Sequence, residues 1–336
     1  MSHTKLDVLA VGNVVTDIFV RLSEDEAKVT KTDKGPILSM AYGTKVPFDH
    51  SEVVPAVGNA SNAAVAFARL GLKSGLVASV AGDAGGREII EHLHKSKVDT
   101  RFVSVAHEVK SQPHFVLWYK EERTILVRDA IDFEYHWPHF RIIDIPNWVY
   151  FSSVGKHAVD YDDQLAHWLE AHPPVKLAFQ PGTFQIETGA KRLKRLYQRA
   201  EIVAVNREEA TIITGGKHED INDLLDKLHA LGPKIVVISD GHAGAYASDG
   251  VKRFKMPIYP DPKPPFERTG AGDAFTSTFV AAIMHGADIE GALLWAPINA
   301  MSVVQKVGAQ AGLLAVKEIE RYLREAPKWY HPERIA

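Results

Sequence analysis

Short runs of apolar residues alternate along the chain with stretches in which apolar residues recur every three or four positions. The runs predict strands, and because few polar residues interrupt them, helices should cover both faces of their sheet. The predicted strands are Leu6–Val11, Ser74–Val80, Trp148–Ser152, Val175–Phe179, Ile202–Val205 and Lys234–Ile238, and the predicted helices include Ala63–Leu70, Arg87–His94, Gln164–Ala171 and Asn222–Leu231. This alternation indicates an α/β protein with a doubly wound, mainly parallel sheet.

Two segments, residues 14–55 and 111–128, break the alternation. The first is rich in turn residues and of mixed polarity, and the second predicts two strands around a turn at Lys120–Arg123. Antiparallel hairpins inserted into a parallel-sheet protein are candidates for a lid over an active site. We therefore predict a single α/β domain over residues 1–330, in which the two inserted segments form a small β-sheet lid.

Composition and charge narrow the class of protein without indicating a function. Of the 336 residues, 46% are hydrophobic and 24% are charged, and the formal net charge is −3. We therefore expect no nucleic-acid or membrane partner. The chain has no cysteine, which excludes disulfides, thiolate metal sites and cysteine nucleophiles. Because no apolar stretch reaches 18 residues and the first residues lack the pattern of a secretory signal, we expect a soluble, cytoplasmic protein.

A glycine-rich stretch before a long apolar helix pattern carries the strongest chemical signal. It runs Glu267-Arg268-Thr269-Gly270-Ala271-Gly272-Asp273-Ala274-Phe275. Small residues let backbone N–H groups converge on an anion, and the helix N-terminus adds its positive dipole end. Asp273 would lie in the first helical turn, where a carboxylate can take the proton of an attacking hydroxyl. On spacing alone, a glycine turn in which Asp273 only caps the helix is an equal alternative.

A second stretch, Val57-Gly58-Asn59-Ala60-Ser61-Asn62-Ala63-Ala64, leads into a predicted helix. Gly58 permits the close approach of a ligand. Asn59 and Asn62 supply paired donors and acceptors that suit neighbouring hydroxyls. An Asn/Ser helix cap without any ligand explains the same residues equally well.

Together, the two stretches resemble the two signatures of the ribokinase-like (PfkB) carbohydrate kinase family. Their order and separation match that family, and the resemblance covers about residues 5–320. Further matching segments are Ala81–Gly86, Asn206–Glu209, Ser239–Gly244 and Gly308–Gln310. The resemblance implies a ribokinase-like fold and an enzyme that transfers the γ-phosphate of ATP, with Mg²⁺, to a hydroxyl of a small sugar or sugar derivative. The expected acceptor is a primary CH₂OH group.

The resemblance also implies roles for residues around the reacting groups. Asp273 is the expected general base. The expected anion hole consists of Gly270, Ala271 and Gly272. The expected substrate-binding residues are Asp17, Gly58, Asn59 and Asn62. For Asp17, capping of the turn that follows the first strand is the alternative role.

On the nucleotide side, the resemblance implies that Glu209 organises Mg²⁺ through water. A carboxylate beside an amide is suitable hard-oxygen chemistry for this cation. The expected nucleotide-binding residues are Asn206, Ser239, Gly241, Gly244 and Asn299. The alternative for Asn206 and Glu209 is a capped start of a helix.

The chain departs from the family pattern at three places. Val57 replaces the first of two glycines, which narrows the expected substrate loop, and Gln180 stands where relatives carry Asp or Asn before a proline. Glu267-Arg268 replaces the usual Asp-Thr. Because that aspartate often belongs to a monovalent-cation loop in relatives, dependence on K⁺ stays open.

Other nucleotide-binding motifs are missing from the sequence: Gly215-Gly216-Lys217-His218 lacks the spacing of a P-loop, and no dinucleotide fingerprint follows the first strand. A nucleoside kinase is the main alternative, and a ligand-sensing homologue without catalysis is a further one. A base slot would need apolar or aromatic side chains, for which the candidates are Phe19, His114, Phe115, Trp118 and Phe133. Packing within the lid explains these side chains as well, and relatives often pair their lids in a homodimer.

Overall fold

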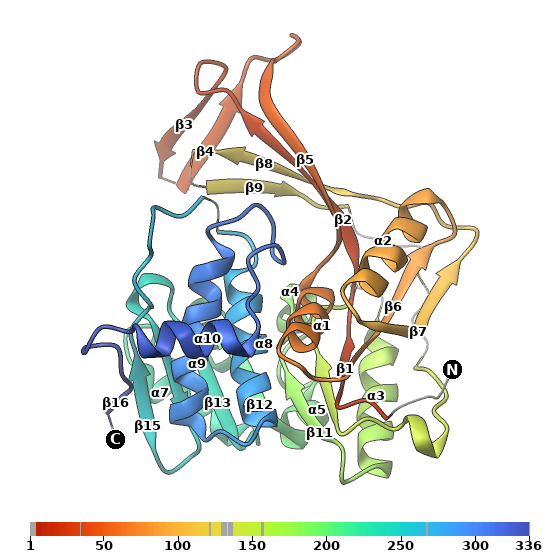
Figure 1. Cartoon of the computed structure of the whole chain (residues 1–336), viewed down its shortest axis with the longest axis vertical. Coiled ribbons are helices and arrows are strands. Elements are labelled where there is room, and N and C mark those ends of the chain that lie inside the picture. The colour runs from red at the N-terminus through yellow and green to blue at the C-terminus, as the bar shows by residue number, and fades with distance from the viewer. Residues whose placement is uncertain are drawn as a thin grey trace.

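The structure, a computed structural model, describes residues 5–33, 35–120, 122–128, 133, 137–155, 158–266 and 268–335. Its body is one large sheet with helices on both faces (Figure 1). The strands, in order across this sheet, are β16 (Glu333–Arg334), β15 (Arg253–Met256), β14 (Ala245–Ser248), β13 (Ile235–Ser239), β12 (Ala200–Asn206), β11 (Lys176–Phe179), β10 (Trp148–Phe151), β1 (Val8–Val11), β6 (Ser74–Ala81) and β7 (Asp99–Ala106).

The sheet is parallel from β7 across to β13 and antiparallel from β13 to β16. Strand β1 shows why its sequence is apolar throughout. Val8 and Ala10 point into the core on one face, whereas Leu9 and Val11 point into the core on the other. All four are fully buried, as expected for a parallel strand covered on both sides.

Two layers of helices complete these cores. One layer packs against Val8 and Ala10, and it contains α1 (Asn59–Arg69), α2 (Ala84–Lys95), α8 (Ala271–Met284), α9 (Ile289–Val303) and α10 (Val316–Arg324). The other packs against Leu9 and Val11, and it contains α3 (Val159–Ala171), α5 (Lys194–Arg199), α6 (Arg207–Thr214) and α7 (Ile221–Ala230). The short helices are α4 (Thr183–Thr188), η1 (Ile142–Asp144) and η2 (Gly241–Ala243).

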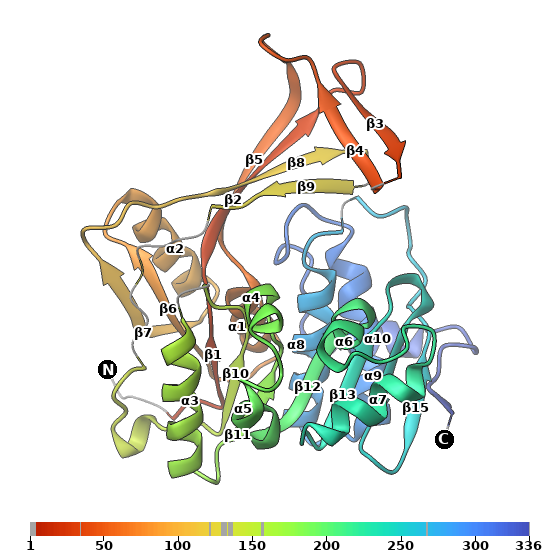
Figure 2. The ribbon, with the colours of Figure 1, turned by 180° about the vertical axis from the view of Figure 1, so that it is seen from behind.

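A separate, smaller sheet projects from the body (Figures 1 and 2). Its strands, in order, are β5 (Phe48–Val57), β2 (Val15–Leu22), β8 (His114–Tyr119) and β9 (Glu122–Leu126), and the hairpin of β3 (Ala27–Thr32) and β4 (Gly35–Met40) lies beyond them. These strands come almost entirely from residues 14–55 and 111–128, for which we keep the name lid. The predicted α/β fold with a large, mostly parallel sheet and a small separate sheet is confirmed.

The boundaries of the elements differ from the prediction at informative places. Helix α1 begins at Asn59 rather than Ala63, because Gly58 caps it with a φ of 116°. The antiparallel strands β14 to β16 were not among the predicted elements. Glu267 lies outside the described residues. None of the helices formed by the described residues combines the length and the apolarity needed to cross a membrane.

Candidate active site

The glycine-rich stretch forms the N-terminus of α8, as expected. Gly270 adopts a left-handed backbone with a φ of 82°, and a Cβ there would lie 2.2 Å from the Cβ of Ala309. A Cβ on Gly272 would meet only open space. The first four amides of the helix, those of residues 270–273, have no intrahelical acceptor, and a helix N-terminus of this kind suits an anion. The role of this turn as an anion hole stays a prediction.

Asp273 lies in this first turn, and two side-chain amides hold its carboxylate. Asn62 donates from Nδ2 to Oδ2 over 2.8 Å, and Gln180 donates from Nε2 to Oδ1 over 3.3 Å. Burial raises the pKa of Asp273 above its usual range, while the two donated hydrogen bonds oppose this rise. The carboxylate is thus only partly exposed, and each of its oxygens accepts one hydrogen bond.

Each of these amides is held in turn by a further side chain. Tyr150 donates its hydroxyl to Oε1 of Gln180. Gln310 donates from Nε2 to Oδ1 of Asn62 over 3.0 Å, and its own Oε1 lies 2.9 Å from Nε2 of His92. A continuous series of side-chain hydrogen bonds therefore leads from Tyr150 on β10, through Asp273, to His92 on α2.

The start of α1 brings the second stretch to the same place. A Cβ on Gly58 would lie 2.8 Å from the carbonyl oxygen of Asn13, so only glycine fits between these two segments. Asn62 is only 5% exposed, and its side chain faces Asp273. The structure thus joins the two sequence stretches directly through one hydrogen bond.

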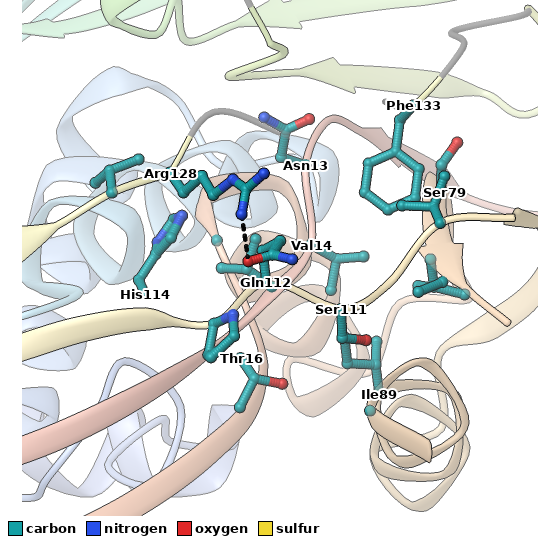
Figure 3. A pocket seen from close by; sticks show the side chains of 18 of the residues that line it. Asn13, Val14, Thr16, Ser79, Ile89, Ser111, Gln112, His114, Arg128 and Phe133 are labelled. Atoms are coloured by element: carbon teal, nitrogen blue, oxygen red, sulfur yellow. Dashed lines mark hydrogen bonds between the residues drawn. The ribbon is translucent and has the colours of Figure 1, made fainter. Parts of the chain in front are cut away.

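A cavity of about 500 Å³ lies between the lid, α2 and the start of α1 (Figure 3). Gly58 and Asn59 line it, as does Phe133. Figure 3 shows Asn13, Thr16, Ser111 and Gln112 around it. Asp17, Asn62 and Asp273 are outside its lining, so it extends away from the carboxylate, beyond the substrate loop.

Asp17 lies on β2 and is almost completely buried. Its partner across the lid strands is His114 on β8, whose Nδ1 lies 3.6 Å from Oδ1 of Asp17. Asp17 does not line the cavity, whereas its neighbour His114 does.

Asn206 and Glu209 form the start of α6. The side chain of Asn206 accepts from the Glu209 amide, and Oε2 of Glu209 accepts from the Asn206 amide, both over 2.8 Å. This reciprocal pair is a capping box, which is the alternative that the sequence left open. Burial raises the pKa of Glu209, and the charges of Asp273 and Glu208 add to the rise.

Comparison with known proteins places this geometry in a family. The pfkB family carbohydrate kinase model matches residues 43–315, most of the chain. The chain belongs to this family. It is therefore a phosphotransferase of the sugar-kinase type, as predicted.

Individual relatives extend the comparison to the whole length of this pfkB family kinase. It is 29% identical to the ribokinase of Bacillus subtilis over 301 residues, 88% of this chain and 95% of that protein. Arabidopsis thaliana ribokinase, solved with ribose and ATP, superposes with a TM-score of 0.76 at 20% identity over 96% of this chain and 99% of that one. The nucleoside kinase of Methanocaldococcus jannaschii superposes with a TM-score of 0.76 at 18% sequence identity, over 96% of this chain and 100% of that one.

In this pfkB family kinase, some of the residues expected at the nucleotide lie together at the ends of neighbouring strands, whereas Gly244 is explained by packing. Asn206 and Ser239 are paired in register at the carboxyl ends of β12 and β13, and Gly241 follows in the next loop. At Gly244, however, a Cβ would lie 2.1 Å from the carbonyl oxygen of Met256. Gly244 is thus required by close packing of the chain.

The expected contact of Asn299 with the nucleotide stays a prediction, and the structure gives this side chain other partners. Asn299 is 0% exposed in the middle of α9. Its Nδ2 donates to the Thr278 hydroxyl over 2.7 Å, and its Oδ1 accepts from the Leu314 amide over 2.9 Å. Both ends of the amide are therefore used to join α9 to its neighbours.

The donors present suit Mg²⁺ held mainly by phosphate and water. Among the described residues, no group of three or more histidine and carboxylate side chains could hold a metal. Mg²⁺ usually keeps several waters and needs only one or two carboxylates besides phosphate oxygens. Glu209, with Oε2 used in the cap, matches an indirect role.

Sequence reasoning missed two of the residues near Asp273, namely Gln180, which bonds to its carboxylate, and Tyr150, which bonds to Gln180. Gln180 was noted only as a departure from the family pattern, and Tyr150 was noted only as part of a predicted strand. Position offered one signal: both lie at or next to the carboxyl ends of neighbouring parallel strands, where α/β proteins place their ligands.

Proposed function

We propose that this protein transfers the γ-phosphate of ATP to a hydroxyl, of the primary CH₂OH kind, on a small sugar or sugar derivative. The observation that supports this most is the hydrogen bond between Asn62 and Asp273. It joins the helix that begins at the substrate loop to the helix that begins at the anion loop.

Asp273 is proposed as the general base. Its place in the first turn of α8 puts a carboxylate beside donors for the transferred phosphoryl group. An ionised carboxylate can accept the hydroxyl proton as the oxygen attacks phosphorus. The backbone amides of Gly270, Ala271 and Gly272 would stabilise the charge that develops on the phosphoryl oxygens.

The nucleotide is proposed to lie along the carboxyl ends of β12 and β13, at Asn206, Ser239 and Gly241. Mg²⁺, when bound, would neutralise charge on the phosphates, and Glu209 would orient its water shell. Glu209 keeps the α6 cap in this arrangement, because one of its oxygens is enough for the cap.

For the acceptor, we propose Gly58 and Asn59 at the loop, with Asp17 approaching when the lid closes. A nucleoside acceptor is the second candidate, and the lining of the cavity favours it. Phe133 and Phe184 contribute aromatic surface beside the loop, and a nucleobase needs such surface in addition to the polar groups that bind its sugar.

The lid is proposed to close over the acceptor and to pair with a second copy of the chain. One contact couples it to the anion loop: Trp118 of β8 packs edge-on against Phe266, with ring centroids 4.9 Å apart. Phe115 is 43% exposed and Val127 is 60% exposed, so apolar lid surface remains for a second subunit.

A panel of sugars and nucleosides, offered with MgATP to the purified protein, tests the proposal. The Asp273→Asn variant should lower kcat by about 10²–10⁴, the scale of a lost general base, and leave ATP affinity nearly unchanged. Near-normal turnover in this variant would remove Asp273 from the mechanism. If the wild type phosphorylates no member of the panel, the acceptor class is wrong.

A further inference from the structure

We propose that Gln180, oriented by the hydroxyl of Tyr150, is a positioning residue that holds the carboxylate of Asp273 ready for proton transfer. This inference rests on the proposed role of Asp273 as the base. The residues lie far apart in the sequence and meet because β10 and β11 are neighbours below the N-terminus of α8.

The position of Gln180 is fixed by the backbone as well as by its side chain. It directly follows β11, and its amide donates to the carbonyl oxygen of Phe151 at the end of β10 over 2.9 Å. From this anchor, its side chain reaches Oδ1 of Asp273 over 3.3 Å. Asn62 holds the other oxygen, so the two amides together restrict rotation of the carboxyl group.

Tyr150 determines which end of the Gln180 amide faces Asp273. The ring of Tyr150 is fully buried and packs edge-on against Phe67 at a centroid distance of 5.3 Å. Burial, with the nearby charge of Asp273, raises the pKa of Tyr150 well above its usual value, so its hydroxyl stays protonated. It can therefore donate to Oε1 of Gln180, which leaves Nε2 directed at Asp273.

The opposite orientation of the amide would be unfavourable at both ends. Oε1 of Gln180 would face an oxygen of the Asp273 carboxylate, and Nε2 would face a hydroxyl that has lost its acceptor. Buried polar groups left in this way cost more than the hydrogen bond they replace. The Tyr150 hydroxyl therefore selects one orientation without contacting Asp273.

The hydrogen bond from Gln180 should change how Asp273 binds a proton, which a purely structural role of Gln180 would not do. A hydrogen bond donated to a carboxylate stabilises its charged form and lowers its pKa. Loss of the Gln180 donor should raise the pKa of Asp273, because burial then acts with less opposition. Since the base must be ionised, the acid limb of the pH–kcat profile should move to higher pH.

The test compares Tyr150→Phe and Gln180→Leu with wild type, using the best acceptor from the panel. Gln180→Leu should lower kcat about tenfold or more, the scale of one lost hydrogen bond to a charged group. Tyr150→Phe should lower kcat by no more than Gln180→Leu, because it removes a hydrogen bond to a neutral amide. The KM of the acceptor should change little, and the acid limb should move to higher pH. The double variant should be no worse than Gln180→Leu alone, because Tyr150 acts only through Gln180.

Tyr330→Phe is the matched control. Tyr330 is also buried and donates its hydroxyl to a single acceptor, the carbonyl oxygen of Leu294, over 2.8 Å. Its loss should lower stability in the same way as Tyr150→Phe but leave the pH profile unchanged. An acid limb that stays in place in both Gln180→Leu and Tyr150→Phe would overturn the inference.

A second measurement needs no turnover, so it separates this inference from the proposed function. The carboxyl carbon of Asp273, assigned in ¹³C NMR spectra by its loss in Asp273→Asn, should titrate at higher pH in Gln180→Leu than in wild type. Identical titrations would refute the hydrogen bond, even if Asp273 is the base. A shifted titration in a protein with no kinase activity would support the hydrogen bond and refute the proposed reaction.

Discussion

Asp162 on α3 should make this protein less stable as the pH rises toward neutrality. Its side chain is only 4% exposed, and Oδ1 accepts a 3.4 Å hydrogen bond from Nε2 of Gln185. Burial raises the pKa of Asp162 to about 7, although Gln185 and Arg192 oppose the rise. In the unfolded chain this carboxyl group ionises near its usual value of 3.8.

The sign and the size of this pH effect follow from the linkage between proton binding and folding. An acid whose pKa is raised by folding stabilises the folded state fully below its unfolded pKa, and this contribution is lost as the pH rises to the folded pKa. Between 3.8 and about 7, the loss amounts to at most about 4 kcal/mol. Asp162→Asn removes the charge and keeps an acceptor for Gln185, so the variant should not suffer this loss.

Urea denaturation at several pH values between about 5 and 8 measures the effect. The stability of Asp162→Asn relative to wild type should rise by about 3 kcal/mol from pH 5 to 7, at about 1.4 kcal/mol per pH unit, and then level off. Asp163→Asn is the control, because its exposed carboxylate pairs with Arg192 and its pKa is lowered by that hydrogen bond. Its effect should be small and constant over this range. If the stability difference between Asp162→Asn and wild type is also independent of pH, the reasoning is refuted.

Three further predictions concern the active site and the lid. Gly270→Ala should cost at least about 1–2 kcal/mol of stability, because alanine disfavours the left-handed backbone and its Cβ would collide with Ala309. The kcat should fall as well, and thermal melts and turnover assays measure the two effects. Glu209→Gln should raise the Mg²⁺ concentration needed for half-maximal rate more than it raises the acceptor KM, and superimposable Mg²⁺ titrations would exclude that role. The double variant Leu117→Asp/Val127→Asp should halve the mass measured by light scattering if the lid pairs two subunits. It should increase ATP hydrolysis relative to phosphate transfer if the lid excludes water. If neither the mass nor this ratio changes, the lid is ordinary surface.

The sequence was sufficient for the fold and for the place of Asp273 in it, because both depend on local patterns. Apolar runs identified the central strands, and the glycine-rich stretch placed Asp273 in the first turn of α8. The direction of Asn62 could not be predicted in the same way. Its contact with Asp273 depends on how α1 and α8 pack, over a separation of 211 residues.

The same limit applies to Asn299 and to Gln180. A motif position shows that a polar residue is present, but burial and hydrogen-bond partners decide whether it faces a ligand or another helix. Asn299 finds both of its partners inside the protein. Gln180 reaches Asp273 only because parallel pairing brings the ends of β10 and β11 together.

The place of β1 between β6 and β10, inside the large sheet, has a consequence for biosynthesis. Val8 pairs with Ser74 on one side and with Trp148 on the other, and the second pairing spans about twice as much chain. Doubling the length of a loop adds only about 0.6 kcal/mol to the cost of closing it, so the final fold is little affected. On the ribosome, however, β1 emerges before both of its partners, and the N–H and C=O groups along one of its edges stay unpaired until Phe151 has been made. The nascent chain must shield that edge throughout the synthesis of the lid.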